Sequence, residues 1–141
     1  MKIPLKTKRD AKKFAIEFAK KVKKGDNIFL IGELGVGKTF FTRELVRKLG
    51  FADTVNSPSF KLINEYTQSI NDFNILHFDL YRLDSTKDAE YLGWDDYLAS
   101  ADICIVEWAE KARDIWPLDF TVLYFEYDEN FDARFVSVSW G

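Results

Sequence analysis

The sequence contains one cysteine and one histidine among 141 residues, and it has no long apolar run. Cys104 has no second cysteine in the chain to pair with, which excludes an internal disulfide, and we interpret it as a small buried hydrophobic residue. His77 cannot form half of a two-histidine metal site, so we expect it to be structural. No apolar run approaches the ~20 residues that span a bilayer, and the first residues show no signal-peptide pattern. We therefore expect a cytoplasmic protein with no membrane association.

The composition is that of a folded domain, which we expect to span residues 1–141 as a single unit. Hydrophobic residues make up 47% of the chain and aromatic residues 16%, which excludes a disordered chain. The net charge is only −3, but residues 1–24 hold ten Lys and Arg against two acidic residues, whereas residues 79–132 hold fifteen Asp and Glu against four basic ones. This asymmetry indicates either an oriented partner surface or two ordinary solvated faces.

The strongest motif lies in residues 28–40, I-F-L-I-G-E-L-G-V-G-K-T-F. Its four leading apolar residues predict a buried strand, and residues 32–39 match the P-loop pattern G-x-x-x-x-G-K-[ST] ahead of an amphipathic run. In such a loop backbone N–H groups converge on phosphate oxygens, Lys38 adds a point charge, and the Thr39 hydroxyl is suited to ligate Mg²⁺. A helix that begins near Gly37 turns its positive end to the same oxygens. The motif predicts a nucleoside triphosphate site.

Two amphipathic helices surround this motif. Thr7 and Asp10 have the spacing of a capping box, and the residues after them form an apolar stripe with a basic opposite face. Gly25-Asp26 is expected to end this first helix, and Gly50 to follow a second helix over 38–49. The stripe consists of Ala11, Phe14, Ala15, Phe18, Ala19 and Val22, and the basic face of Arg9, Lys12, Lys13, Lys20, Lys23 and Lys24.

The middle of the chain predicts a loop over 52–60, whose hydroxyls could reach a γ-phosphate or metal, or which could be a plain connection. Strands over 60–66 and 75–78 are separated by a turn at 71–74, which indicates an antiparallel pair. Asp79 directly follows the second strand. Two short helices, over 86–91 and 94–99, are separated by Gly93.

A second chemical motif is I-C-I-V-E at residues 103–107, four apolar residues that end in Glu107. This is the form of a Walker B strand, whose acid lies beside the metal and the attacking water. Segments 120–127 and 134–140 then alternate as a closing hairpin around residues 128–133. The sequence predicts a three-layer α/β fold of the P-loop NTPase type, with a mixed central sheet that has a parallel core and an antiparallel edge hairpin.

These residues resemble the TsaE (YjeE) family of small bacterial P-loop ATPases, over nearly the whole chain. The shared motifs are G-E-L-G-V-G-K-T (32–39), V-N-S-P-S-F (55–60), N-E-Y (64–66), H-F-D-L-Y-R-L (77–83), L-G (92–93) and V-E-W (106–108). The chain departs from the family pattern at Asn56 and Ser59, where threonines are usual, and at Ala109, where proline is usual. Asn56 lacks a hydroxyl, so a hydroxyl-to-metal role there is not expected.

The resemblance implies a set of site residues. Lys38 would be catalytic, Thr39 would ligate Mg²⁺, and Glu107 would touch the metal or orient water, with Asp79 supporting the metal shell. The nucleotide base would lie between Thr7 and the last hairpin near Ala133 and Arg134. The phosphates would be held by Gly35, Val36, Gly37, Lys38, Thr39 and Phe40.

The resemblance also implies a Mg²⁺-dependent ATPase of the tRNA threonylcarbamoyladenosine pathway, monomeric alone, whose partners are the TsaD and TsaB proteins. Hydrolysis would reset that complex without direct chemistry on tRNA. The chain offers no obvious arginine finger apart from Arg82, so turnover is expected to be slow without the partners. The basic face of the first helix could contact an acidic partner or the tRNA backbone.

Three other classes compete with this interpretation. A small-metabolite kinase would share the P-loop, but the chain has little material for an acceptor pocket and an arginine-bearing lid. A GTPase switch would need the guanine-reading [NT]-K-x-D pattern, whereas Thr86-Lys87-Asp88 places its aspartate one residue early. A nucleotide-dependent adaptor with incidental hydrolysis would use the same site, and the sequence does not separate it from the ATPase.

Overall fold

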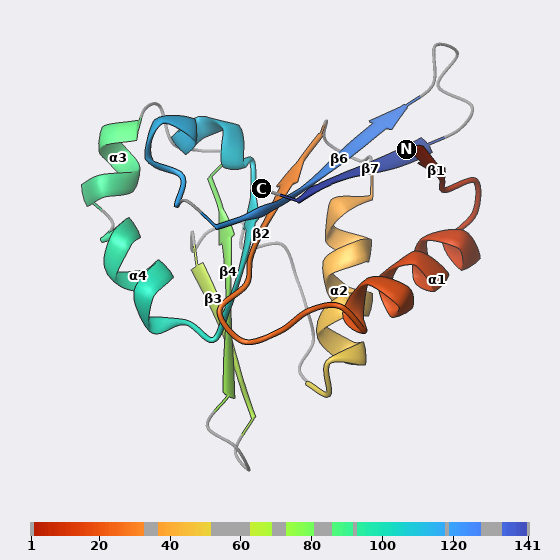
Figure 1. The fold of residues 1–141 in the computed structure, drawn as a ribbon, viewed down its shortest axis with the longest axis horizontal. Helices are drawn as coiled ribbons and strands as arrows, with labels where there is room; N and C mark the ends of the chain where they lie inside the picture. The colour runs from red at the N-terminus through yellow and green to blue at the C-terminus, as the bar shows by residue number, and fades with distance from the viewer. Residues whose placement is uncertain are drawn as a thin grey trace.

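A mixed sheet forms the centre of the molecule (Figure 1). The computed structural model describes residues 2–32, 37–51, 63–68, 73–80, 86–91, 93–117, 119–127 and 134–140. Across these residues the seven strands run in the order β1-β7-β6-β2-β5-β4-β3. They are β1 (Lys2–Pro4), β2 (Asn27–Ile31), β3 (Ile63–Gln68), β4 (Phe73–Asp79), β5 (Ile103–Glu107), β6 (Thr121–Tyr127) and β7 (Arg134–Trp140).

The sheet has a parallel core with antiparallel strands on both sides. β4, β5, β2 and β6 are parallel neighbours, β3 pairs antiparallel with β4, and β7 lies antiparallel between β6 and β1. The predicted mixed sheet and the antiparallel pairing of β3 with β4 are confirmed. The sequence did not predict that β6 joins the parallel core beside β2, so that the last hairpin belongs to the centre of the fold.

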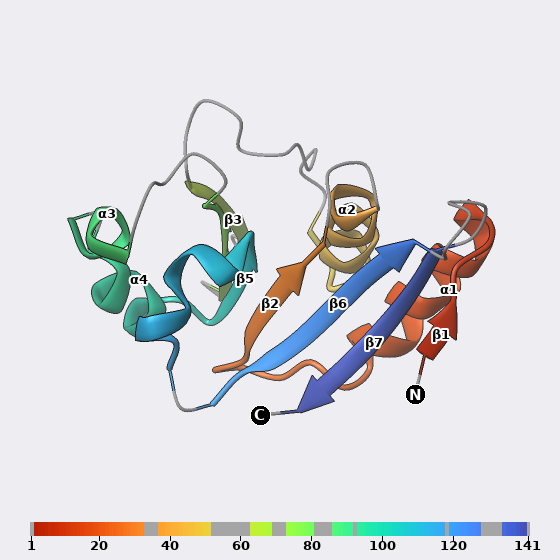
Figure 2. The same cartoon turned by 90° about the horizontal axis from the view of Figure 1, so that it is seen from above.

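Helices cover both faces of this sheet and complete three layers (Figures 1 and 2). Helices α1 (Lys8–Ala19) and α2 (Lys38–Lys48) pack on one face, and α3 (Thr86–Tyr91), α4 (Trp94–Ser100) and the 3₁₀ helix η1 (Ala109–Ile115) lie on the other. Strand alternation explains the two cores, because Ile28 and Leu30 face α1 and α2 whereas Phe29 faces Trp94 of α4.

Aromatic rings join α1 and α2 to the sheet. Phe41 of α2 lies 5.6 Å from Phe14, 5.7 Å from Phe18 and 5.6 Å from Phe125 of β6, measured between ring centroids. Phe41 is 1% exposed, so its burial contributes about 1.5–3 kcal/mol to folding. This cluster fixes α2, and with it the position at which α2 begins.

The predicted capping box at the start of α1 and the predicted glycine after α2 are both present. Thr7 accepts from the backbone N–H of Asp10, whose carboxylate accepts from the N–H of Thr7, as a capping box requires. Gly50 adopts φ +99° directly after Leu49, the C-cap residue of α2. The prediction that Gly25-Asp26 ends the first helix was wrong, because α1 already ends at Ala19. The N–H groups of Lys21 and Val22 donate to the carbonyls of Phe18 and Ala19, three residues back, and this tightens the end of the helix into a turn. Val22 still packs against the core.

Two elements have no counterpart in the sequence expectations. β1 is only three residues long and is held by its pairing with β7, so its own sequence carries too few residues to show alternation. η1 follows Trp108 and contains a kink at Ala112, which breaks any regular helical period. The predicted loop over 52–60 and the predicted turn at 128–133 lie outside the described residues.

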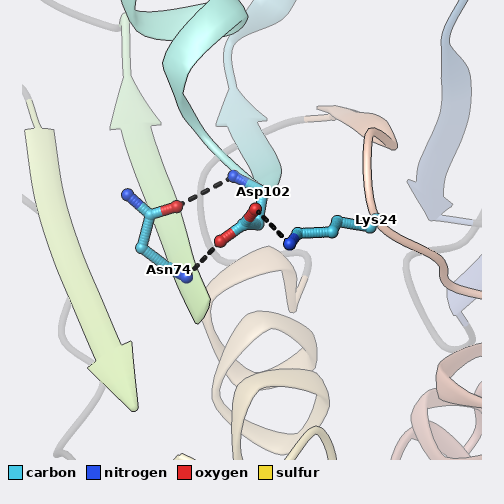
Figure 3. Close-up of polar contacts among 3 residues, drawn as sticks. All are labelled: Lys24, Asn74 and Asp102. Carbon is cyan, nitrogen blue, oxygen red and sulfur yellow. Dashed lines mark hydrogen bonds and ion pairs between the residues drawn. The ribbon is translucent and has the colours of Figure 1, made fainter. Parts of the chain in front are cut away.

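Side chains close the amino-terminal edge of β4 and β5 (Figure 3). The backbone N–H of Asn74 donates to Asp102 Oδ2 over 2.8 Å, and the backbone N–H of Asp102 donates to Asn74 Oδ1 over 2.8 Å. Lys24, which leads into β2, adds an ion pair with Asp102 Oδ1 at 3.4 Å. The reciprocal bonds lock the register of the two strands where they begin.

Replacing Asp102 with alanine should lower the free energy of unfolding by about 1–3 kcal/mol, because the half-buried N–H of Asn74 loses its acceptor. Lys24→Ala removes only an ion pair whose lysine is exposed, and should cost less than about 1 kcal/mol. Urea unfolding followed by circular dichroism measures both. Equal losses in the two variants would show that the ion pair, rather than the reciprocal bonds, stabilises this edge.

Candidate functional site

The carboxyl ends of three parallel strands meet the start of α2. β2 ends at Ile31, β4 at Asp79 and β5 at Glu107, and the register places Glu107 opposite both Asp79 and Leu30. The backbone N–H of Leu80 donates to the Glu107 carbonyl over 3.1 Å, which ties β4 to β5 just beyond the last pair. This edge of an open parallel sheet is where α/β proteins commonly bind ligands.

Gly37 starts α2 in a conformation that suits glycine. Its φ is +110°, and a Cβ atom there would lie 3.5 Å from a guanidinium nitrogen of Arg134. No side chain caps the first turn of α2. The N–H groups of this turn and the positive end of the helix dipole are thus directed to the sheet edge, which suits an anion.

Lys38 is 4% exposed, and its ammonium group is held by protein groups. Nζ donates to the Gly32 carbonyl over 2.5 Å and lies 4.0 Å from the centre of the Trp108 ring. Burial lowers the pKa of Lys38, and the negative charges of Glu107, Glu110 and Asp79 oppose this shift. Lys38, Asp79 and Glu107, the site residues that the family resemblance implies, therefore lie within electrostatic reach of one another.

Glu107 is a buried carboxylate with a buried partner. It is 3% exposed, and its Oε2 lies 2.7 Å from Nε2 of His77, which is fully buried. Both side chains project from the sheet face that α1 and α2 cover, because Ile75 and Ile105, which have the same parity on their strands, pack in that core. The prediction that His77 is a structural residue did not include this contact.

Trp108 follows Glu107 in a strained backbone conformation. Its φ is +59°, and it is the one residue other than glycine with positive φ among those described. Its N–H donates to the Leu30 carbonyl over 3.1 Å, and η1 begins directly after it. A bulky residue held in the left-handed region costs of order 1 kcal/mol and is typical of functional sites. The turn places the indole against Lys38.

Glu110 adds a third carboxylate on η1. Its Oε1 is buried and has no hydrogen-bond partner within the described residues. Burial raises the pKa of Glu110, although its backbone hydrogen bond and the nearby Lys38, Arg113 and Lys111 oppose the shift. No role was predicted for Glu110, because nothing in its spacing distinguishes it from an exposed acid on a helix.

A hollow opens beside the first turn of α2. It is lined by Leu5, Thr7, Lys8, Ala11, Gly37, Phe40 and Arg134. Thr7 and Arg134 come from the two segments between which the family resemblance implies that the nucleotide base would lie. A wider hollow lies at the opposite edge of the sheet, around Lys21, Lys24 and Asp119, and contains none of the predicted site residues.

The remaining predicted residues are only partly covered by the structure. Thr39 and Phe40 lie half-buried in the first turn of α2. Gly35, Val36, Ala133 and Arg82 lie outside the described residues. Within the described part, no group of three or more His, Cys, Asp and Glu residues could hold a metal ion by itself, and no helix is long and apolar enough to cross a membrane.

Comparisons with known proteins agree over most of the chain. A family model described as "Threonylcarbamoyl adenosine biosynthesis protein TsaE" matches residues 5–135. The chain is 39% identical over 127 residues to the tRNA threonylcarbamoyladenosine biosynthesis protein TsaE of Haemophilus influenzae, which covers 89% of this chain and 78% of that protein. It is 37% identical over 112 residues to the same-named protein of Rickettsia prowazekii, and this match covers 79% of this chain and 76% of that protein.

A solved structure matches the whole fold. The crystal structure of Bacillus subtilis YdiB superposes with a TM-score of 0.80 at 27% sequence identity, and the match covers 100% of this chain and 86% of that one. The mixed sheet with its two helical layers is therefore an arrangement that a homologous chain adopts in a crystal.

Glu110 generates a pH-dependent prediction. A carboxyl whose folded pKa is raised contributes most to stability below the ordinary value of 4.5, and this contribution is lost as the pH rises through the folded pKa. Charged Glu110 therefore costs stability near neutrality. Glu110→Gln should raise the urea midpoint at about pH 7.5, and the gain should vanish by about pH 4. Glu90→Gln, at an exposed position, is the control, and a gain that is equal at both pH values would contradict the assignment.

Proposed function

The chain belongs to the TsaE family of threonylcarbamoyl adenosine biosynthesis proteins, and from this we propose that it is a Mg²⁺-dependent ATPase acting in tRNA threonylcarbamoyladenosine biosynthesis. Its fold would then be that of a P-loop NTPase. The observation that carries the proposal is the meeting of Lys38, Asp79 and Glu107 at the carboxyl edge of the sheet, directly at the start of α2.

Phosphate binding follows from the start of α2. The loop from Gly35 to Phe40 would surround the phosphates, and the N–H groups of the first turn would donate to their oxygens. Lys38 would exchange the Gly32 carbonyl for a phosphate oxygen, a stronger acceptor because it is charged. Burial of Lys38 strengthens this attraction, because little water screens it.

The residues present fit a magnesium ion. The hydroxyl of Thr39 and the carboxylates of Asp79 and Glu107 are the hard oxygen ligands that Mg²⁺ prefers. Mg²⁺ commonly takes only one or two protein ligands and completes its shell with water and phosphate oxygens. The described residues contain no cluster of three acidic, cysteine or histidine ligands, and such a cluster is not needed for this mode of Mg²⁺ coordination. When bound, the ion would neutralise charge on the phosphate oxygens.

The remaining steps belong to the chain's own residues. Glu107 would orient the attacking water or hold the metal shell, and Asp79 would support it from the neighbouring strand. Arg82, the candidate arginine finger that the sequence offers, lies outside the described residues. We propose that the TsaB–TsaD pair completes the site, so that hydrolysis acts on that complex. Hydrolysis would then be slow for the isolated chain, as it is for P-loop enzymes that depend on an activating partner protein.

The decisive experiment is ATP hydrolysis by the purified chain, alone and with TsaB and TsaD. We expect stimulation by the pair, and a loss of about 10²-fold or more in kcat for Lys38→Ala and Glu107→Ala, as for removal of a preorganised charge. Lys48→Ala, an exposed lysine on the same helix, is the matched control and should retain wild-type turnover. Binding of ATP with no stimulated hydrolysis would favour a nucleotide-dependent adaptor.

The base site can be tested separately. If the hollow beside Thr7 and Phe40 holds the base, Arg134→Ala should weaken ATP binding by about 5-fold, since Arg134 lines the hollow beside Gly37 and contributes a partly screened charge. Arg9→Ala, an exposed arginine on α1, should change affinity by less than about 2-fold. Fluorescence titration with a labelled ATP analogue measures both, and equal effects would remove the base from this hollow.

A further inference from the structure

His77 is buried at the site without an assigned role in the chemistry. It is fully buried on β4, two residues before Asp79, and its ring lies 6.3 Å from the ring of Tyr66 on β3. Burial of a polar ring carries a desolvation cost unless a hydrogen bond compensates for it. Its hydrogen bond goes to Glu107.

We propose that His77 is a positioning residue that fixes Glu107 through an Nε2–H donor. The inference rests on the proposed function, because Glu107 is the residue through which it acts. The Nε2–Oε2 distance is 2.7 Å, in the range of a charge-assisted bond, and both groups are shielded from water. This bond commits Oε2 of Glu107 to the histidine, which leaves Oε1 as the oxygen for water or the metal shell.

Burial decides which tautomer makes this bond. Nδ1 of His77 is also buried, and it has no hydrogen-bond partner among the residues that the structure describes. A hydrogen on Nδ1 would therefore be a buried donor without an acceptor, and Nε2 would then face the carboxylate with a lone pair. The tautomer with its hydrogen on Nε2 avoids both costs. The ring thus supports the carboxylate through its Nε2–H donor.

The backbone reinforces the same geometry. In the register of β4 and β5, His77 lies opposite Ile105 and Asp79 lies opposite Glu107, so the histidine reaches its partner diagonally on one sheet face. Without His77, a glutamate side chain would lose its fixed rotamer and would sample other orientations at the strand end. The expected consequence is a slower chemical step with unchanged nucleotide binding.

Two nearly isosteric variants separate positioning from packing. His77→Gln keeps an N–H donor near the position of Nε2. His77→Met introduces a side chain of similar length and shape to glutamine but without the donor. Partners of this kind change activity by about 10- to 100-fold when lost, so His77→Met should lower the kcat of stimulated hydrolysis by at least about 10-fold. We expect His77→Gln to stay within about 3-fold of wild type, and KM to change in neither variant by more than about 2-fold.

The outcomes distinguish this inference from the proposed function. Equal kcat values for the two variants, in a background where the wild type is stimulated, would overturn the role of His77 alone. A parallel rise in KM would indicate general disruption of the site and would also overturn it. A wild-type chain that binds ATP but never hydrolyses it would remove the proposed function, and this inference with it.

A measurement on the wild-type chain covers the case in which either variant fails to fold. Because the chain has a single histidine, ¹⁵N-edited NMR of its ring reports on His77 without assignment. We expect the Nε2–H tautomer, and a change in the Nε2 shift in Glu107→Gln. An Nδ1–H tautomer, or a ring spectrum that Glu107→Gln leaves unchanged, would overturn the proposal.

Discussion

The site depends on opposite charges that the fold buries together at one edge of the sheet. Lys38 is 4% exposed and Glu107 is 3% exposed, and neither would be tolerated there without partners. Lys38 has the Gly32 carbonyl and the Trp108 ring, and Glu107 has His77. Burial lowers the pKa of the lysine even so, which means that its surroundings do not fully replace water. A bound polyanion would supply the negative charge that the buried ammonium group of Lys38 lacks, so this edge is suited to bind one.

The alignment of β2, β4 and β5 is what brings these charges together. Parallel strands end at a common edge, and alternation then sorts their side chains between the two faces. His77, Asp79 and Glu107 share the face that α2 covers, because each has the parity of the isoleucines in that core. Phe41 and its ring contacts hold α2 on the same face, so Lys38 at its start reaches the strand ends.

Local patterns in the sequence predicted much of this arrangement. The capping box at Thr7, the helix over 38–49, the strand ending in Glu107 and the antiparallel pair before Asp79 all depend on residues close in the chain, and the structure contains each of them. The bond between His77 and Glu107 spans thirty positions and exists only because β4 and β5 are neighbours. Strand order is a tertiary property, and for the same reason the place of β6 beside β2 and the contact between Lys38 and Trp108 were not predicted.

β4 and β5 are held together at their amino-terminal edge and present charged side chains at their carboxyl edge. At the amino-terminal edge, Asn74 and Asp102 satisfy each other's backbone N–H groups, and the start of β4 is fixed against the start of β5 (Figure 3). At the carboxyl edge, the same strands present His77, Asp79 and Glu107 within a few residues of that fixed register. A slip of one residue in register would move these side chains to the other face of the sheet, so the bonds at the first edge help to keep the histidine and the glutamate on one face at the second. The closed amino-terminal edge thus allows the carboxyl edge to hold charged side chains in a set geometry.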